Sequence, residues 1–277
     1  MRTSMDNVTE TDAWGDETHA MVFDYLHKMP NFIVKRHYET FNEGRLLKDY
    51  AGMLEAGDFF EIGCATGELY RYIKNFMPDF KYQGFDISEP AINRARTKYR
   101  DGNFHLLTNG FDEIRENFGR PNVVWCRDVV MHQERPYKFL ENVINLSRDV
   151  SILRLRTRDE GETVIDSNIS CQLHWDKFWV PYIVLNINEL IDKISENKEV
   201  SKIVISRSYE VLGGQNYRYL PKELYFKESG TSETAIMVIK GERNKTGKVD
   251  ITFMDKQDRP KLSIFERIIR KLSLLFR

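Results

Sequence analysis

The sequence predicts an α/β fold with a doubly wound, mostly parallel sheet and helices on both of its faces. Short apolar segments alternate with helical patterns between residues 58 and 155. This alternation is typical of βαβ units, whose strands pair in parallel. The crossovers of such units are right-handed, which places helices on both faces of the sheet. The chain of 277 residues is long enough for one large domain with insertions.

The elements can be assigned in order along the chain. Two amphipathic stretches, 17–28 and 41–56, are expected to form an N-terminal helical cap. Apolar segments bounded by turn residues then predict strands at 58–62, 81–85, 103–107, 122–126 and 150–155. Helical patterns between these strands predict helices at 68–75, 89–99, 112–117 and 137–146.

The regular alternation ends after residue 155. A helix is expected at 188–195 and two further strands at 202–211 and 235–240, which brings the sheet to about seven strands. Two long connections, 157–184 and 212–234, remain without a clear period. Long loops are usually functional or disordered, and their aromatic content argues against disorder. We therefore expect both connections to be insertions that contact the substrate.

The two ends of the chain differ in composition from the region between them. Residues 1–15 are polar and predict a disordered tail, and residues 16–240 are assigned to the main domain. Residues 241–260 are polar and are interpreted as a linker. Residues 261–277 predict a basic amphipathic C-terminal helix with apolar side chains on one face and Arg267, Arg270 and Lys271 on the other.

The composition excludes several classes of function. The formal net charge of −1 gives no electrostatic case for nucleic-acid binding. Three scattered cysteines, Cys64, Cys126 and Cys171, form no zinc spacing and favour a reducing compartment. The polar N-terminus lacks the regions of a signal peptide, and no apolar run approaches a membrane span. We expect a cytoplasmic protein and no metal site.

A glycine-bearing turn follows the first predicted strand. The segment EIGCATG at residues 61–67 reads as strand, tight turn and helix, and glycines suit a turn whose main chain touches a ligand. Its spacing departs from GxGxxG, and its carboxylate, Glu61, would repel a pyrophosphate but suit a cationic ligand. A plain strand-to-helix turn, with no ligand, is the alternative.

The pattern ExGxAxG, with Asp86 at the end of the next strand and the segment from Asp128 to His132 after the fourth, resembles the class I S-adenosylmethionine-dependent methyltransferases. The resemblance implies a Rossmann-like sheet whose last strand is antiparallel. It also implies that Asp86 accepts both ribose hydroxyls, although Asp86 can also be read as a helix cap. The cofactor residues that it implies are Glu61, Gly63, Cys64, Ala65, Gly67, Asp86, Ile87, Asn109 and Arg127.

Two histidines are candidate bases for the acceptor. His132 follows the fourth strand and has a reference pKa near neutrality, although a histidine is frequent there in the family whatever the substrate. His174 lies in the first insertion, where Asp176 could orient it and where Trp175, Trp179 and Tyr182 could stack on a ring. An aromatic cluster under a loop is the alternative for this region.

Arg154, Arg156 and Arg158 alternate along the fifth strand and so share one face. Because an inner strand is normally apolar on both faces, arginines there suggest a bound substrate anion. Salt bridges to Glu160, Glu162 or Asp166 are the alternative. The expected substrate-binding residues are Arg154, Arg156, Trp175 and Tyr182.

Together these features predict an S-adenosylmethionine-dependent O-methyltransferase for a small molecule or saccharide. The C-terminal helix suggests peripheral contact with the inner membrane surface and thus a membrane-linked glycan, unless the helix docks on protein. The alternatives are an RNA or protein methyltransferase and a non-catalytic cofactor-binding scaffold. The oligomeric state stays open.

Overall fold

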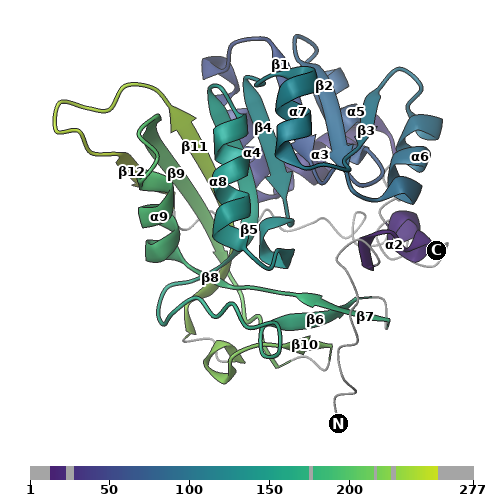
Figure 1. Cartoon of the computed structure of the whole chain (residues 1–277). Coiled ribbons are helices and arrows are strands. Elements are labelled where there is room, and N and C mark those ends of the chain that lie inside the picture. Colours follow the sequence, from purple (N-terminus) through teal and green to yellow (C-terminus); the bar gives the residue numbers. More distant parts are fainter. Residues whose placement is uncertain (1–12, 23–27, 175–176, 215–216, 226–228, 255–277) are drawn as a thin grey trace.

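The computed structural model describes residues 13–22, 28–174, 177–214, 217–225 and 229–254 (Figure 1). A large, mostly parallel sheet lies between two layers of helices, and a small sheet lies below one edge of it. This arrangement confirms the predicted α/β class. The predicted C-terminal helix, 261–277, lies outside the described residues.

The strand order of the large sheet is β3-β2-β1-β4-β5-β11-β9-β12, and β8 pairs with the end of β5. Strands β1 to β5 pair in parallel, and β11 runs antiparallel to β5 and β9, as expected for the last predicted strand. The bounds are Asp58–Ile62 (β1), Lys81–Asp86 (β2), Asn103–Leu106 (β3), Val123–Arg127 (β4), Val150–Arg158 (β5), Leu185–Asn186 (β8), Val200–Tyr209 (β9), Thr231–Lys240 (β11) and Asp250–Phe253 (β12).

Helices cover both faces because successive strand residues point to opposite sides. Phe59 and Phe60 are both fully buried, one in each of the two main hydrophobic clusters. One cluster includes side chains of α7 (Phe111–Phe118), α8 (Pro136–Leu146) and α9 (Ile187–Ser195). The other includes side chains of α3 (Asn31–Thr40), α4 (Asn42–Tyr50), α5 (Glu68–Phe76) and α6 (Glu89–Lys98).

The two insertions form a small sheet of their own. Strand β6 (Cys171–His174) pairs antiparallel with both β7 (Phe178–Pro181) and β10 (Arg218–Tyr219). This sheet lies beside the carboxyl ends of β4 and β5 (Figure 1). The sequence did not predict these strands. Strands β6 and β7 form a local hairpin, whereas β10 joins it from a distant segment, with Arg218 opposite Gln172.

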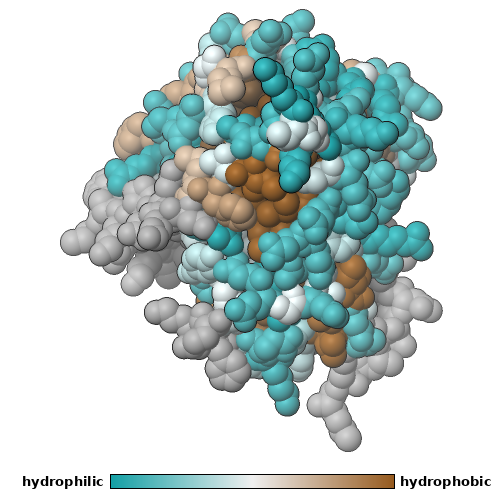
Figure 2. All heavy atoms as spheres, turned by 90° about the vertical axis from the view of Figure 1, so that its left-hand side faces the viewer, coloured by the Kyte–Doolittle hydropathy of each residue, from teal (hydrophilic) through white to brown (hydrophobic). Residues whose placement is uncertain are grey.

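Three further features differ from the sequence-based expectations. Helix α3 lies in a stretch with no predicted element, and residues 13 and 14 of the predicted tail are helical, with Ala13 buried. Strand β12 lies inside the predicted linker 241–260 and pairs in parallel with β9, so that part of the linker belongs to the sheet. The face seen in Figure 2 carries an apolar area near the edge of the sheet that β12 forms, where Ile251 and Phe253 are exposed.

The helix α2 (Glu17–Val22) begins where the first cap helix was expected. The second predicted cap helix corresponds to α4 and the short helix η1 (Ala51–Met53). Within the described ranges, no helix is both long and apolar enough to span a bilayer.

Candidate active site at the carboxyl edge of the sheet

The turn after β1 is held in a conformation that leaves no room for side chains at its glycines. Gly63 and Gly67 have φ values of 79° and 78°, in the left-handed region that favours glycine. A Cβ on Gly63 would lie 2.4 Å from Val129 Cγ2, and one on Gly67 would lie 2.5 Å from Phe104 Cε1. Ala65 also has a positive φ, of 44°. The main chain of this turn is therefore closely packed and fixed in shape.

Asp86, at the end of β2, holds this turn in place. Its Oδ2 accepts a hydrogen bond from the Ala65 backbone N–H at 2.7 Å, and its Oδ1 accepts one from Ser88 N–H at 2.8 Å. Burial raises the pKa of this carboxyl, although the backbone N–H groups oppose the rise. Ser88 itself caps α6, so the alternative that Asp86 is the helix cap is wrong.

Glu61 is buried beside the same turn. Its Oε2 accepts a hydrogen bond from the Tyr82 hydroxyl. Burial raises the pKa of Glu61 to about 8, although Tyr82 and the charge of Arg127 oppose the rise. The neighbouring Cys64 is buried too, and burial raises the pKa of its thiol. Glu61 is thus protonated near neutral pH unless a cation approaches it.

The other residues expected to contact the cofactor lie around this turn with different surroundings. Ile87 is half-buried directly after β2. Asn109 is exposed, and its backbone N–H donates to Glu113 Oε2 at 2.8 Å, which is a turn-stabilising contact. Arg127 at the end of β4 pairs with Glu43 at 3.1 Å, so its guanidinium is engaged within the protein.

His132 is buried directly after β4, in the short helix η2 (Val130–His132). Its Nδ1 lies 2.8 Å from the carbonyl oxygen of Pro181, which can only accept, so Nδ1 carries the hydrogen. Burial lowers the pKa of His132 to about 4, although the bond to Pro181 opposes this. The imidazole is therefore neutral at pH 7, with the lone pair on Nε2 available to accept a proton.

The indole of Trp14 lies between the two predicted catalytic histidines. Its ring centroid is 4.9 Å from that of His132 and 4.6 Å from that of His174. Nearby, Asp16 accepts a hydrogen bond from Lys177 Nζ at 2.7 Å. Sequence reasoning missed Trp14, because this residue stands in a polar stretch without periodicity. Trp175 and Asp176 lie outside the described residues, so a His174–Asp176 pair stays a prediction.

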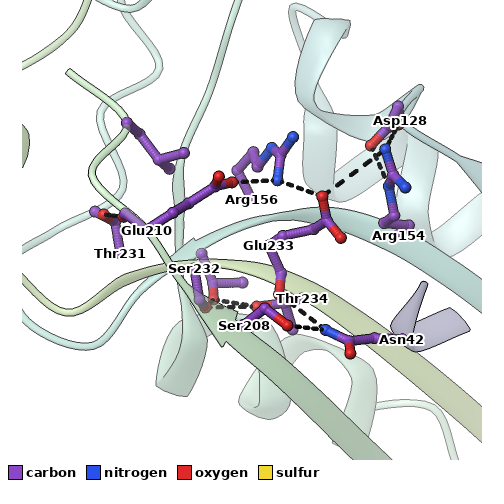
Figure 3. A network of polar contacts seen from close by, with 12 residues as sticks. Asn42, Asp128, Arg154, Arg156, Ser208, Glu210, Thr231, Ser232, Glu233 and Thr234 are labelled. Atoms are coloured by element: carbon purple, nitrogen blue, oxygen red, sulfur yellow. Dashed lines mark hydrogen bonds and ion pairs between the residues drawn. The ribbon is translucent and has the colours of Figure 1, made fainter. Parts of the chain in front are cut away.

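The arginines of β5 pair with carboxylates of the protein, which corrects the expectation that Arg154 and Arg156 await a substrate anion. Arg154 is buried, bonds both oxygens of Asp128, and lies 3.2 Å from Glu43 Oε1. Arg156 lies 2.6 Å from Glu210 and 3.0 Å from Glu233 (Figure 3). Their charges are compensated internally, as buried charges require.

Arg158 behaves in the same way. It lies 3.2 Å from Glu223 Oε1 and donates to the backbone carbonyls of Glu160 and Glu162. The alternative of salt bridges thus holds for all three arginines, but through other carboxylates than those proposed. Sequence reasoning missed Glu43 and Glu233, which α4 and β11 bring to β5 from distant parts of the chain.

The same ion pairs act on Asp128. Burial raises the pKa of this carboxyl, but Arg154, Arg156 and Arg127 outweigh burial and hold the pKa well below its usual range. Its φ of 56° is in the left-handed region, and its backbone N–H donates to Arg154 O at 2.9 Å. Asp128 therefore fixes the end of β4 against β5. No cluster of three or more metal-ligating side chains occurs in the described ranges.

Tyr182 completes the group around His132. Its ring centroid lies 5.7 Å from that of His132, and its hydroxyl accepts a hydrogen bond from Arg156 Nε at 3.1 Å. A separate pocket of about 240 Å³ lies at the opposite, amino edge of the sheet, lined by residues such as Tyr50, Val123 and Ile239. It contains none of the predicted site residues, so the candidate site remains at the carboxyl edge.

Comparison with known proteins relates part of this chain to methyltransferases. Residues 60–151 match a family model described as a methyltransferase domain. A putative methyltransferase 235L of Invertebrate iridescent virus 6 is 21% identical over 122 residues, which is 44% of this chain and 46% of that protein. The chain therefore matches less than half the length of this curated relative.

Two solved structures share the fold. One is the O-methyltransferase from a trans-AT PKS multienzyme of Brevibacillus brevis in complex with S-adenosyl-L-homocysteine, with a TM-score of 0.51 and 10% identity over 85% of this chain and 80% of that one. The other is the plantazolicin methyltransferase BamL, with a TM-score of 0.50 and 14% identity over 83% of this chain and 94% of that one. Residues 60–151 thus resemble a methyltransferase domain, and the chain shares with these two structures a Rossmann-like fold, a mostly parallel sheet between helices.

Proposed function

We propose that this chain transfers a methyl group from S-adenosylmethionine to a hydroxyl of a small molecule. The observation that carries the proposal is the turn at residues 63–67, which has no space for a Cβ at Gly63 and is tethered to the buried Asp86. A plain turn does not require a buried carboxylate at the end of the adjacent strand, because burying a charge is costly.

The residues present fit the cofactor. Each Asp86 oxygen accepts one backbone hydrogen bond, and a carboxylate oxygen has a second lone pair, so two ribose hydroxyls can still be bound. Glu61 is buried and favours a cationic group such as the ammonium of the methionine part. When bound, S-adenosylmethionine supplies a methyl group on a sulfonium that is its own leaving group.

His132 is proposed as the general base. Its neutral imidazole is fixed by the Pro181 carbonyl, so Nε2 takes the proton from the acceptor hydroxyl as the carbon–oxygen bond forms. His174 and Tyr182 belong to the small sheet and its connection, and their rings contact those of Trp14 and His132, which provides aromatic surface for a small acceptor at this edge. A saccharide, also on a membrane-linked glycan, is the acceptor that the sequence favours. The location is proposed to be cytoplasmic, with contact at the inner membrane surface.

The proposed binding of the cofactor is tested by calorimetric titration with S-adenosyl-L-homocysteine. Wild type is expected to bind, and Asp86→Ala to bind about tenfold to a hundredfold more weakly because hydrogen bonds to a charged group are lost. Asp112→Ala, at an exposed position on α7, is the matched control with unchanged affinity. No binding by wild type, or equal binding by Asp86→Ala, contradicts the proposal.

The proposed methyl transfer to a small molecule is tested by following a radiolabelled methyl group into the fractions of a cell extract. Label is expected in the small-molecule fraction, and His132→Ala should reduce the rate about a hundredfold or more. His105→Ala, which changes a half-buried histidine on β3, is the control. Label in RNA or protein would support a macromolecular acceptor instead, and no transfer to any fraction would support a binding scaffold.

A further inference from the structure

Arg218 differs from the other arginines near the site. Arg127, Arg154, Arg156, Arg158 and Arg207 each pair with a carboxylate of the protein. Arg218 has no carboxylate partner in the described ranges. Its polar contacts are long ones, from Nη1 to Leu212 O at 3.3 Å and from Nη2 to Gln172 Oε1 at 3.5 Å. Among the described residues, no carboxylate thus compensates its positive charge.

The small sheet directs Arg218 toward the candidate site. Arg218 on β10 lies opposite Gln172 on β6, and residues opposite one another in an antiparallel pair share a face. His174, two residues after Gln172, is on that face as well. This is the face on which His174 contacts Trp14, beside His132.

Aromatic rings hold the guanidinium in a fixed position. Its Cζ lies 4.1 Å from the ring centroid of Tyr182 and 5.5 Å from that of Tyr217. Tyr182 is itself bound by Arg156 and lies 5.7 Å from His132, ring to ring. The charge of Arg218 also contributes to the low pKa of His132, as expected for neighbouring groups. Tyr182 thus contacts both the guanidinium of Arg218 and the imidazole of the proposed base.

The Nε of Arg218 is buried and has no hydrogen-bond partner among the residues that the structure describes. A buried donor without a partner is destabilising, and such groups in native proteins call for a ligand or another explanation. The planar guanidinium offers paired N–H groups that match the two oxygens of a carboxylate or phosphate. The geometry therefore fits an oxyanion.

We propose that Arg218 binds an oxyanion of the methyl acceptor, a carboxylate or a phosphate, so that the substrates are acidic small molecules. The proposal rests on the proposed function, because it places the anion in the acceptor site beside His132. Arg218 takes the role that the sequence suggested for Arg154 and Arg156, whose charges are already compensated.

The test measures binding of benzoate, phenyl phosphate and the neutral benzamide to the full chain saturated with S-adenosyl-L-homocysteine. Wild type is expected to bind benzoate or phenyl phosphate at least about tenfold more tightly than benzamide. Arg218→Gln should lose about tenfold or more of this anion affinity, and Arg218→Lys should retain part of it. Arg120→Gln is the control, because Arg120 binds Ser147 O and Glu199 at the opposite edge of the sheet.

Three outcomes overturn the proposal: benzamide binding as well as the anions, Arg218→Gln binding them as wild type does, or neither anion binding to wild type. If Arg218→Gln does not fold, the comparison of anions with benzamide on wild type decides. A preference for benzoate or for phenyl phosphate distinguishes the two oxyanions. Binding of S-adenosyl-L-homocysteine itself tests the proposed function separately, since Arg218 variants are expected to keep that affinity.

Discussion

Two buried ionisable side chains, Glu61 and His132, are shifted toward their neutral forms. Burial raises the pKa of Glu61 to about 8 and lowers the pKa of His132 to about 4. Both shifts have the same physical cause, since a buried site disfavours the charged form of either group. Near neutral pH both side chains are therefore uncharged before any ligand binds, and a charged ligand can change their protonation.

His132 should make the free energy of unfolding depend on pH. Between about pH 4 and pH 6.5 the unfolded imidazole takes up a proton that the buried one does not, so the free energy of unfolding rises with pH. The rise amounts to about 3 kcal/mol for this shift. Urea unfolding across this range should show the rise in wild type and lose it in His132→Gln.

Comparing wild type with His132→Gln isolates the contribution of His132 to the pH dependence of the free energy of unfolding. Glu61 contributes with the opposite sign and is present in both proteins. A carboxyl with a raised pKa makes the folded state less stable as pH rises from about 4.5 to 8. Equal pH dependence in wild type and His132→Gln would show that the imidazole is not buried as described.

Glu61 should release a proton when S-adenosylmethionine binds. A cationic ligand favours the carboxylate, so binding near pH 7 lowers a pKa that starts at about 8. Calorimetry in two buffers of different ionisation enthalpy should detect this release. Below pH 8, the affinity for S-adenosylmethionine should increase by up to about tenfold for each unit by which the pH is raised. Glu61→Gln should bind without proton release. Release of the same size in this variant would assign the proton to another group.

At the scale of secondary-structure elements, a buried charge cluster joins α4 to the sheet. Glu43 of α4 is 1% exposed and lies 3.1 Å from Arg127 of β4 and 3.2 Å from Arg154 of β5. Glu233 of β11 reaches the same strand, directly opposite Arg156 in the register. The cluster therefore fixes three strand ends and one helix at the edge that carries the site. Figure 3 shows the part of it formed by Arg154, Arg156 and Glu233.

Glu43→Gln should destabilise the fold strongly. It removes one charge from a buried cluster and leaves the guanidinium groups undercompensated, which costs about 3–5 kcal/mol in comparable cases. Glu141→Gln is the matched control, because Glu141 is exposed and pairs with Lys138 at 3.0 Å on the surface, where a pair contributes about 0–1 kcal/mol. Urea unfolding measures both, and equal losses would contradict the role of burial.

At the scale of the whole molecule, the site is assembled from three separate parts of the chain. The sheet edge contributes His132, the N-terminal segment contributes Trp14, and the small sheet contributes His174 and Arg218. These parts lie together at the lower end of the large sheet in Figure 1. Neither insertion alone could form the three-stranded small sheet, because β10 requires β6 as its partner.

The C-terminal segment gives a prediction that concerns the molecule as a unit. Its apolar and basic sequence pattern suits a membrane interface, so deletion of residues 260–277 should release the protein from anionic vesicles. Affinity for S-adenosyl-L-homocysteine should not change. Vesicle sedimentation measures the first effect, with neutral vesicles and an Arg267→Gln/Arg270→Gln variant as controls. Unfolding of the truncated chain would instead support docking of this segment on protein.

The sequence by itself determined the succession of strands and helices from β1 to β5 and the place of the turn. Strand β1 and the start of α5 lie where the local patterns predicted, and Asp86 ends β2 beside Gly63 as spacing indicated. These features depend on residues close together in the chain, whose apolar period and turn chemistry are readable directly. The parallel order of the strands then brings the turn and Asp86 to one edge.

Only the tertiary structure decided which charged and aromatic side chains are available at that edge. Arg154 is separated from Glu43 by 111 positions, and Arg156 from Glu233 by 77, so no local pattern shows that these arginines are paired. The same holds for Trp14 between His132 and His174. Charge compensation depends on distance in space, and the fold alone sets that distance, which is why Arg218 rather than Arg154 remains without a carboxylate partner in the described part of the chain.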